Sequence, residues 1–227
     1  HFIKNTINLR SNITLEGEGP ESIITRKQEH QLSPMVYTGG GLKDLVIRNL
    51  TIDGARSRED RGTDEWTWPR GLDILDRDNG RNKRVFISGV HIKRTSHGFH
   101  SKGTDDLIIK DVNFTNNGCN FAYAHNLYLR RNNRVIIRDS RFTDSHTGNG
   151  INLTKQYNIV VKGNTLANNA FRGLRAANTT NIVIDGNVAF DNGRFGIGTR
   201  SEDGGVRSYI MINNYSADND RDNYSIK

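Results

Sequence analysis

The sequence predicts an all-β fold, a single-stranded right-handed parallel β-helix (a solenoid) of about eight coils. An apolar-x-apolar triplet recurs along the chain, and its last five intervals are 22, 28, 24, 23 and 27 residues. Such self-similarity is typical of solenoids, in which each unit packs on its neighbours. The runs around the triplets, such as LIIKDVNF and IVVKGNTL, alternate apolar and polar residues or are fully apolar, as strands are. The triplets begin at Leu45, Val85, Leu107, Val135, Ile159, Ile182 and Tyr209.

The remaining elements follow from these triplets. Residues Ile13 to Leu15 match the pattern and are expected to form a first coil. No segment keeps a helical apolar face, which argues against leucine-rich, ankyrin and tetratricopeptide repeats. The 23 Gly residues suit turns that need positive φ, and the low count of 3 Pro leaves strand N–H donors intact. We predict one domain over residues 1–227, with an inserted loop at about 54–70.

A further strand, often opened by Gly, follows the triplet in each coil, and strand side chains alternate between faces. The inward positions are predicted to be Leu72, Phe99, Leu127, Ile151, Leu174, Ile197 and Tyr224. One outward row, expected to face solvent, consists of Asp73, His100, Tyr128, Asn152, Arg175 and Gly198. A second outward row consists of Leu75, Lys102, Arg130, Thr154, Ala177, Arg200 and Lys227.

The charge of the chain indicates an anionic partner, because its formal net charge is +7. No nucleic-acid-binding motif is present, and no apolar run is long enough to span a membrane. We therefore expect an anionic polysaccharide as partner, no nucleic acid, no membrane, and a secreted or periplasmic location; the oligomeric state stays open. The single cysteine, Cys119, cannot form an internal disulfide and is expected to be structural.

The outward rows predict a groove for an extended polyuronate, with one cation per coil meeting successive carboxylates. Such a site supports abstraction of the C5 proton beside a neutralised carboxylate, followed by β-elimination or C5-epimerisation. The predicted catalytic residues are His100, Tyr128, Lys102 and Arg130. The predicted substrate-binding residues are Asn152, Lys155, Arg172, Arg175, Arg200, His125, His146, Trp66 and Trp68. Both tryptophans lie in the inserted loop, where they suit sugar stacking or a lid.

Several motifs have structural interpretations. Asn117, Asn169, Asn192 and Asn219 recur at one turn and predict a stacked asparagine ladder, while His97 is expected to cap a turn. We predict no cofactor and no metal site; calcium at turn acids such as Asp105 is conceivable but not indicated. The alternatives are a tailspike-like glycan depolymerase that hydrolyses its substrate and a non-catalytic carbohydrate-binding solenoid. Hydrolysis needs paired carboxylates, and Asp73 is the only acid in the two rows.

Two stretches resemble a known family. The opening INLRSNITLEGEGPESII is similar to the first coil of pectate-lyase-like right-handed β-helix proteins. The segments from GLKDLVIRNLTIDG to FRGLRAANTTNIV resemble the catalytic module of mannuronan C5-epimerases and related alginate lyases, which implies the same activity class. That family carries a Tyr-Gly-Phe segment running into Asp-Pro-His-Glu. Here His97 takes the Tyr place, His100 the Asp place and Lys102 the His place.

Overall fold

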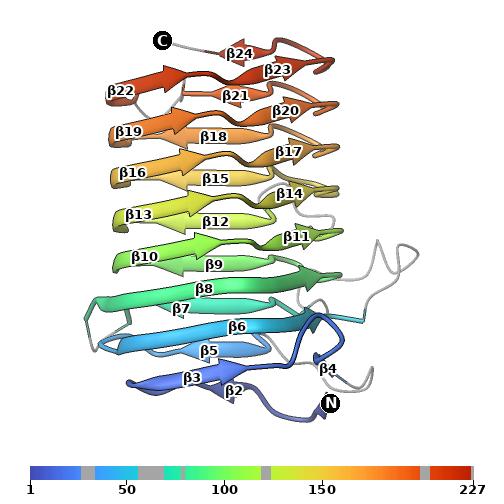
Figure 1. Cartoon of the computed structure of the whole chain (residues 1–227), viewed down its shortest axis with the longest axis vertical. Coiled ribbons are helices and arrows are strands. Elements are labelled where there is room, and N and C mark those ends of the chain that lie inside the picture. Colours follow the sequence, from blue (N-terminus) through green and yellow to red (C-terminus); the bar gives the residue numbers. More distant parts are fainter. Residues whose placement is uncertain (27–33, 56–68, 78–79, 119–123, 200–204, 226–227) are drawn as a thin grey trace.

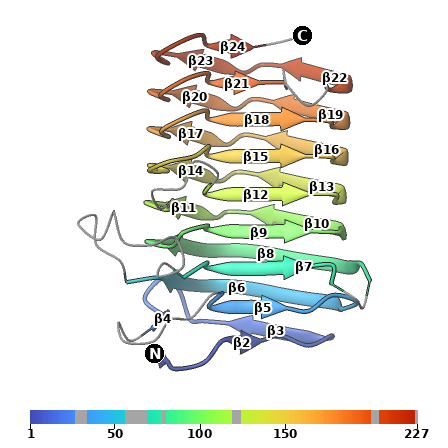
Figure 2. The same cartoon turned by 180° about the vertical axis from the view of Figure 1, so that it is seen from behind.

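The computed structural model describes residues 1–26, 34–55, 69–77, 80–118, 124–199 and 205–225, and these form a stack of flattened coils (Figures 1 and 2). All regular elements in this part of the chain are strands, and every strand pairing is parallel. Each coil has three strands, so three strand faces run along the stack. The predicted fold class, a right-handed parallel β-helix, is thereby confirmed.

The first face begins each coil with the apolar triplet. It consists of β3 (Ile13–Glu16), β6 (Lys43–Asp53), β8 (Asn82–Lys93), β10 (Thr104–Lys110), β13 (Asn133–Arg138), β16 (Tyr157–Lys162), β19 (Thr180–Asp185) and β22 (Arg207–Ile212). Strands β6 and β8 are long enough to continue around the corner into the second face. The second face adds β1 (Phe2–Ile3), β4 (Ile23–Arg26), β11 (Asn113–Thr115), β14 (Arg141–Thr143), β17 (Thr165–Ala167), β20 (Val188–Phe190) and β23 (Tyr215–Ala217).

The third face is a separate nine-stranded sheet, called here the groove sheet, and it lies in front in Figure 2. Its strands are β2 (Ile7–Asn8), β5 (Val36–Thr38), β7 (Leu72–Leu75), β9 (Phe99–Lys102), β12 (Leu127–Arg130), β15 (Ile151–Thr154), β18 (Leu174–Ala177), β21 (Ile197–Gly198) and β24 (Tyr224–Ser225). The inward residues predicted from Leu72 to Ile197 are all fully buried, which confirms the predicted register. Tyr224 continues the same stack on the last rung but is 36% exposed.

Hydrogen-bonded side chains close the corners of the coils. The predicted asparagine ladder is confirmed: Asn169 donates to Asn192 over 2.9 Å, and Asn192 donates to Asn219 over 2.8 Å. A second ladder, not predicted, runs from Asn164 through Asn187 to Asn214 at the corner between the first and second faces. These side chains satisfy backbone groups that the turns leave unpaired.

One rung of the first ladder has Ser145 where its neighbours have Asn, and a residue from another row fills the gap. Asn126 stands where the adjacent coils have glycine, and its side chain reaches inward to complete the ladder. The Asn126 amide accepts from Asn117 over 2.9 Å and donates to Asn169 over 3.1 Å. The chain of hydrogen bonds therefore stays continuous through the middle of the solenoid.

Candidate functional site

The outer side of the groove sheet carries the polar row predicted from the sequence. The parallel register aligns Asp73, His100, Tyr128, Asn152, Arg175 and Gly198 on successive coils. The neighbouring row aligns Leu75, Lys102, Arg130, Thr154 and Ala177. The structure thus brings His100 and Tyr128 side by side, with Lys102 and Arg130 in the adjacent row.

The expectation that the whole row faces solvent is wrong for three of its members, because Asp73, Asn152 and Gly198 are buried. Asp73 is 0% exposed and Asn152 is 7% exposed, although both project from the outer side of the sheet. Asp73 is covered in part by Arg70, whose Nη1 lies 3.0 Å from its carboxylate. Asn152 is held between His125 and Arg175, at 2.9 and 3.2 Å. The row is therefore a packed polar layer.

Four rings gather at the centre of this layer. His100 and Tyr128 stack with ring centroids 5.0 Å apart and planes 10° from parallel. His97 lies 6.2 Å from His100, and His125 meets Tyr128 edge-on at 5.6 Å. The stacking fixes the orientation of the His100 ring, because offset and edge-on contacts of this kind are favourable.

Backbone hydrogen bonds determine which nitrogen of two histidines carries the hydrogen. His97 Nδ1 accepts from the backbone N–H of His125 at 3.2 Å, which confirms the predicted turn cap. His125 Nδ1 accepts from the backbone N–H of Asn149 at 3.0 Å. Each neutral ring must therefore carry its hydrogen on Nε2. His125 Nε2 lies 2.9 Å from the amide nitrogen of Asn152, and Arg175 Nη1 donates to the amide oxygen over 3.2 Å.

Burial shifts the titration of the central groups in opposite directions. Desolvation raises the pKa of Asp73 to about 6, against the opposing attraction of Arg70 and Arg77. Desolvation, with repulsion from His97 and nearby cations, lowers the pKa of His100 to about 3. At neutral pH His100 is therefore an uncharged ring beside an ionised Asp73.

This pair has the arrangement of a base and its orienting group. His100 Nδ1 lies 3.9 Å from Asp73 Oδ1, close enough for a carboxylate to favour a hydrogen on Nδ1. His100 Nε2 is buried and, within the described part of the chain, has no hydrogen-bond partner. A neutral imidazole with a bare Nε2 can accept a proton.

Cations line the neighbouring row and the upper end of the layer. Lys102 lies 3.0 Å from Asp76, and the buried Nε of Arg130 has no hydrogen-bond partner among the described residues. Arg172 leans across the rung above Arg175, where a side chain at Gly198 would come within 3.7 Å of its Cδ. The stem of Arg172 therefore passes at ordinary contact distance from the Gly198 position.

The other predicted site residues lie elsewhere. Lys155 occupies the corner after β15 and lines a hollow with Arg131 and Tyr157, outside the polar row. His146 lines a second hollow at the opposite corner, before β15. Lys155 and His146 lie outside the polar row because corner residues project away from the sheet. Arg200, Trp66 and Trp68 lie outside the described residues, as do Cys119 and the acids Glu202 and Asp203.

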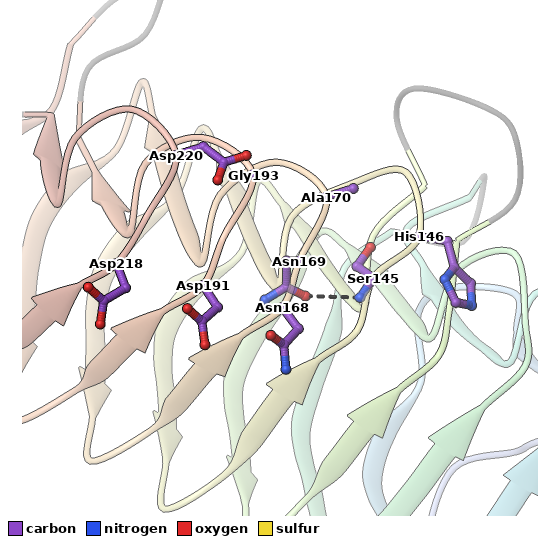
Figure 3. A pocket seen from close by; sticks show the side chains of 9 residues that line it. All are labelled: Ser145, His146, Asn168, Asn169, Ala170, Asp191, Gly193, Asp218 and Asp220. Atoms are coloured by element: carbon purple, nitrogen blue, oxygen red, sulfur yellow. Dashed lines mark hydrogen bonds between the residues drawn. The ribbon is translucent and has the colours of Figure 1, made fainter.

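Figure 3 shows the second hollow, which is acidic. Asp191 and Asp218 occupy equivalent places after β20 and β23, and Asp220 lies nearby. Across the described ranges, no group of three or more His, Cys, Asp and Glu side chains is arranged to hold a metal ion. The same residues contain no helix of the length and apolarity needed to cross a membrane.

Comparison with solved structures finds the same fold in an epimerase module and in two bacteriophage proteins. The A-module of the mannuronan C-5 epimerase AlgE4 of Azotobacter vinelandii superimposes with a TM-score of 0.76 at 21% identity, covering 96% of this chain and 58% of that one. The tailspike of E. coli bacteriophage HK620, solved with a pentasaccharide, gives 0.68 at 16% identity, covering 93% and 39%. Gene product 12 of bacteriophage phi29, in its pre-mature form, gives 0.68 at 15% identity, covering 87% and 29%.

The chain thus spans little more than half of that epimerase module and less of the two phage proteins. A comparison with curated protein sequences finds no match. The family model described as "Right handed beta helix region" matches residues 74–226, which is more than half of the chain. With its three parallel faces and its stacked ladders, the chain belongs to the right-handed β-helix family.

Proposed function

We propose that this protein modifies an acidic polysaccharide, a polyuronate such as alginate, by removing the C5 proton of a uronate residue. The observation that carries this proposal is the unpartnered, buried Nε2 of a neutral His100, stacked on Tyr128 between Asp73 and the cations. The likeness in fold to a mannuronan epimerase and to a tailspike crystallised with a pentasaccharide supports a carbohydrate substrate.

In the proposed reaction His100 is the base. Its Nε2 takes the C5 proton, and the ionised Asp73 carboxylate 3.9 Å from Nδ1 acts against the burial and the cations that lower the pKa of His100. Lys102 and Arg130 bind the uronate carboxylate, so that the charge developing there is neutralised. This step is the most demanding one, since the C5 proton is only weakly acidic.

Tyr128, one coil above His100, is the acid. In an elimination its hydroxyl protonates the leaving glycosidic oxygen, the C4–O4 bond breaks and a C4=C5 double bond forms. In an epimerisation the hydroxyl returns a proton to the opposite face of C5, and the chain stays intact. The two outcomes use the same groups and differ only in where the second proton goes.

The test is incubation with alginate, pectate and glucuronan. Elimination produces unsaturated uronate ends that absorb ultraviolet light, and epimerisation exchanges the C5 proton with solvent, which NMR detects. We expect one of these signals, and the variant His100→Ala should reduce turnover by about 10²- to 10⁴-fold. The control His91→Gln changes a histidine on the second face and should keep full turnover. No signal on any of the three polymers would reject the proposal.

The acidic hollow favours a second candidate, hydrolysis by a tailspike-like mechanism. Asp191 and Asp218 stand one coil apart, about 5 Å by the strand spacing, within the range of paired carboxylates in glycosidases. Both residues are exposed, whereas a carboxyl group that stays protonated as an acid usually needs burial. Release of reducing ends without ultraviolet absorbance, abolished by Asp191→Asn, would favour this candidate over the lyase or epimerase.

A further inference from the structure

Five basic residues adopt the left-handed backbone region, either at corners of the coils or near the start of a first-face strand. Arg84, Arg94, Arg131, Arg134 and Lys155 have φ values of 54, 56, 55, 54 and 55°. Residues other than Gly and Asn adopt this backbone region at a cost in free energy, so a basic residue there needs an explanation. For three of the five residues the explanation is the same: each pairs with a carboxylate from the preceding coil.

The three explained residues each form a paired hydrogen bond with an acid. Arg84 Nε donates to Asp44 over 2.6 Å, and Arg94 Nε donates to Asp53 over 2.7 Å. Arg134 donates to Asp106 over 2.5 and 3.0 Å. These pairs link adjacent coils and neutralise the charges.

The other two, Arg131 and Lys155, have no acidic partner in the part of the chain that the structure describes. They occupy the same corner on consecutive coils, directly after β12 and β15, so their backbones lie about 5 Å apart. Both line the hollow described above beside Tyr157, which has a volume of about 430 Å³. Two uncompensated cations converging on one hollow favour an anionic ligand.

The walls of this hollow suit a sugar. Tyr157 forms one side and is 52% exposed, so its ring is accessible to a ligand. On the other side Arg81 donates to Asp105 over 3.0 and 2.7 Å and also to the backbone oxygen of Arg131 over 2.9 Å. The Arg81 bond holds the Arg131 turn in place, and Asp105 can accept hydrogen bonds from hydroxyl groups.

We propose that this hollow is a second binding site for an acidic sugar residue. Tyr157 stacks on the face of the pyranose ring, and Arg131 and Lys155 bind its carboxylate or sulfate group. The site begins one residue beyond Arg130 and Thr154, so it lies beside the edge of the polar row. It is distinct from the catalytic groups, although the choice of a uronate as ligand rests on the proposed function.

The test uses substitutions to residue types that already occupy the same corner in other coils. The same corner holds Gly103 and Asn178 in neighbouring coils, with φ values of 67 and 50°. Arg131→Gly and Lys155→Asn therefore remove the charges while keeping residues that tolerate this backbone. The matched control is Arg134→Gly, because Arg134 in β13 has the same backbone conformation but is already neutralised by Asp106. Thermal unfolding should show that all three variants stay folded.

The measurement is calorimetric titration with a uronate trisaccharide, a sulfated trisaccharide and a neutral trisaccharide. Wild type and Arg134→Gly should bind two uronate molecules per chain. The Arg131→Gly/Lys155→Asn double variant and Tyr157→Ala should each weaken one of the two sites at least tenfold. The neutral sugar should not occupy the hollow, and binding of the sulfated sugar there as well would show recognition of charge alone.

Two results would overturn the second site: a double variant with unchanged stoichiometry and affinity, or equal binding of the neutral sugar at the hollow. The test of the second site can succeed or fail independently of the test of the proposed function. Loss of a binding site in the double variant, without any turnover of polyuronate by wild type, would keep the hollow and reject the catalytic proposal. Turnover of polyuronate by wild type, together with unchanged binding in the double variant, would keep the catalytic proposal and reject the second site.

Discussion

The same coils present two outer faces of opposite chemistry. On the groove sheet, the outward row is polar and contains Asp73, His100, Tyr128 and Asn152. On the first face, the row at the centre of each triplet begins with Thr14 and is apolar from the next coil on: Val46, Phe86, Ile108, Ile136, Val160, Val183 and Ile210. Both rows stand outside the core, and each repeats once per coil.

Burial on these two faces is the reverse of the usual distribution. Asp73 and Asn152 are 0% and 7% exposed, whereas Ile136 and Ile210 are 36% and 55% exposed. A polar group costs free energy when it is buried, so the groove sheet keeps an arrangement that stability alone would not select. The comparison teaches that the inner rows and the corners specify the fold, while the two outer faces are available for other tasks.

The largest loss of stability is expected at the corner between the second face and the groove sheet, where the first asparagine ladder stands. Asn169 accepts from Ser145 N and from Asn126 at 3.1 Å and donates to Phe142 O and Asn192 at 3.0 and 2.9 Å. Asn169→Ala leaves several buried groups unpaired, each at about 1–3 kcal/mol, so the free energy of unfolding should fall by about 3–6 kcal/mol. Urea denaturation measures it.

The control for this variant is Asn113→Ala, an outward asparagine in β11 that makes no side-chain hydrogen bond among the described residues. It should change the free energy of unfolding by no more than about 0.5 kcal/mol. Equal losses in the two variants would mean that the ladder does not hold the corner together.

A smaller effect, with a pH signature, is expected from the buried acid of the polar face. The pKa of Asp73 is raised from 3.8 to about 6, so the folded state favours its protonated form. The Asp73 carboxyl group therefore contributes its full amount to the free energy of unfolding below pH 3.8, and this contribution is lost as pH rises through 6. Asp73→Asn removes this loss and should raise stability at pH 8 by up to about 3 kcal/mol, at about 1.4 kcal/mol per pKa unit.

The histidines titrate with the opposite sign. Burial lowers the pKa of His97 to about 4 and that of His100 to about 3, so their contribution is present above pH 6.5 and lost as pH falls through these values. Wild type and Asp73→Asn share these histidines, so the advantage of Asp73→Asn should stay nearly constant from pH 8 to just above pH 6 and shrink between about pH 6 and pH 4. A constant difference across this range, measured by urea denaturation, would show that Asp73 is not the group responsible.

Much of this organisation can be predicted from the sequence, because strands alternate with period two and the coil repeat aligns equivalent positions. That reasoning places His100 beside Tyr128 and buries Phe99 and Leu127. It fails where the surroundings decide. The burial of Asp73 depends on neighbours such as Arg70, which no periodicity encodes.

The corners show a second limit of sequence reasoning. Lys155 and His146 were expected near the groove, but corner backbone in the left-handed region, or a loop before a strand, sends side chains away from the sheet. The coil repeat places Asn126 at a position that adjacent coils fill with Gly98 and Gly150, and the repeat alone gives this asparagine no role. Its part in the ladder depends on Ser145 being too short to fill that rung, and Ser145 is 19 positions away in the sequence.

The smallest effect is expected on the apolar outer face, in a comparison of two adjacent residues. Ile136→Thr removes a partly exposed side chain but keeps β-branching, so the free energy of unfolding should change by about 0.5 kcal/mol or less, with turnover unchanged. Ile137→Thr, one position on, places a hydroxyl in the core at a site that is 0% exposed and should cost about 2 kcal/mol or more. Similar losses in thermal and urea unfolding would mean that Ile136 is covered in solution, and the two outer faces would then not differ in the way described.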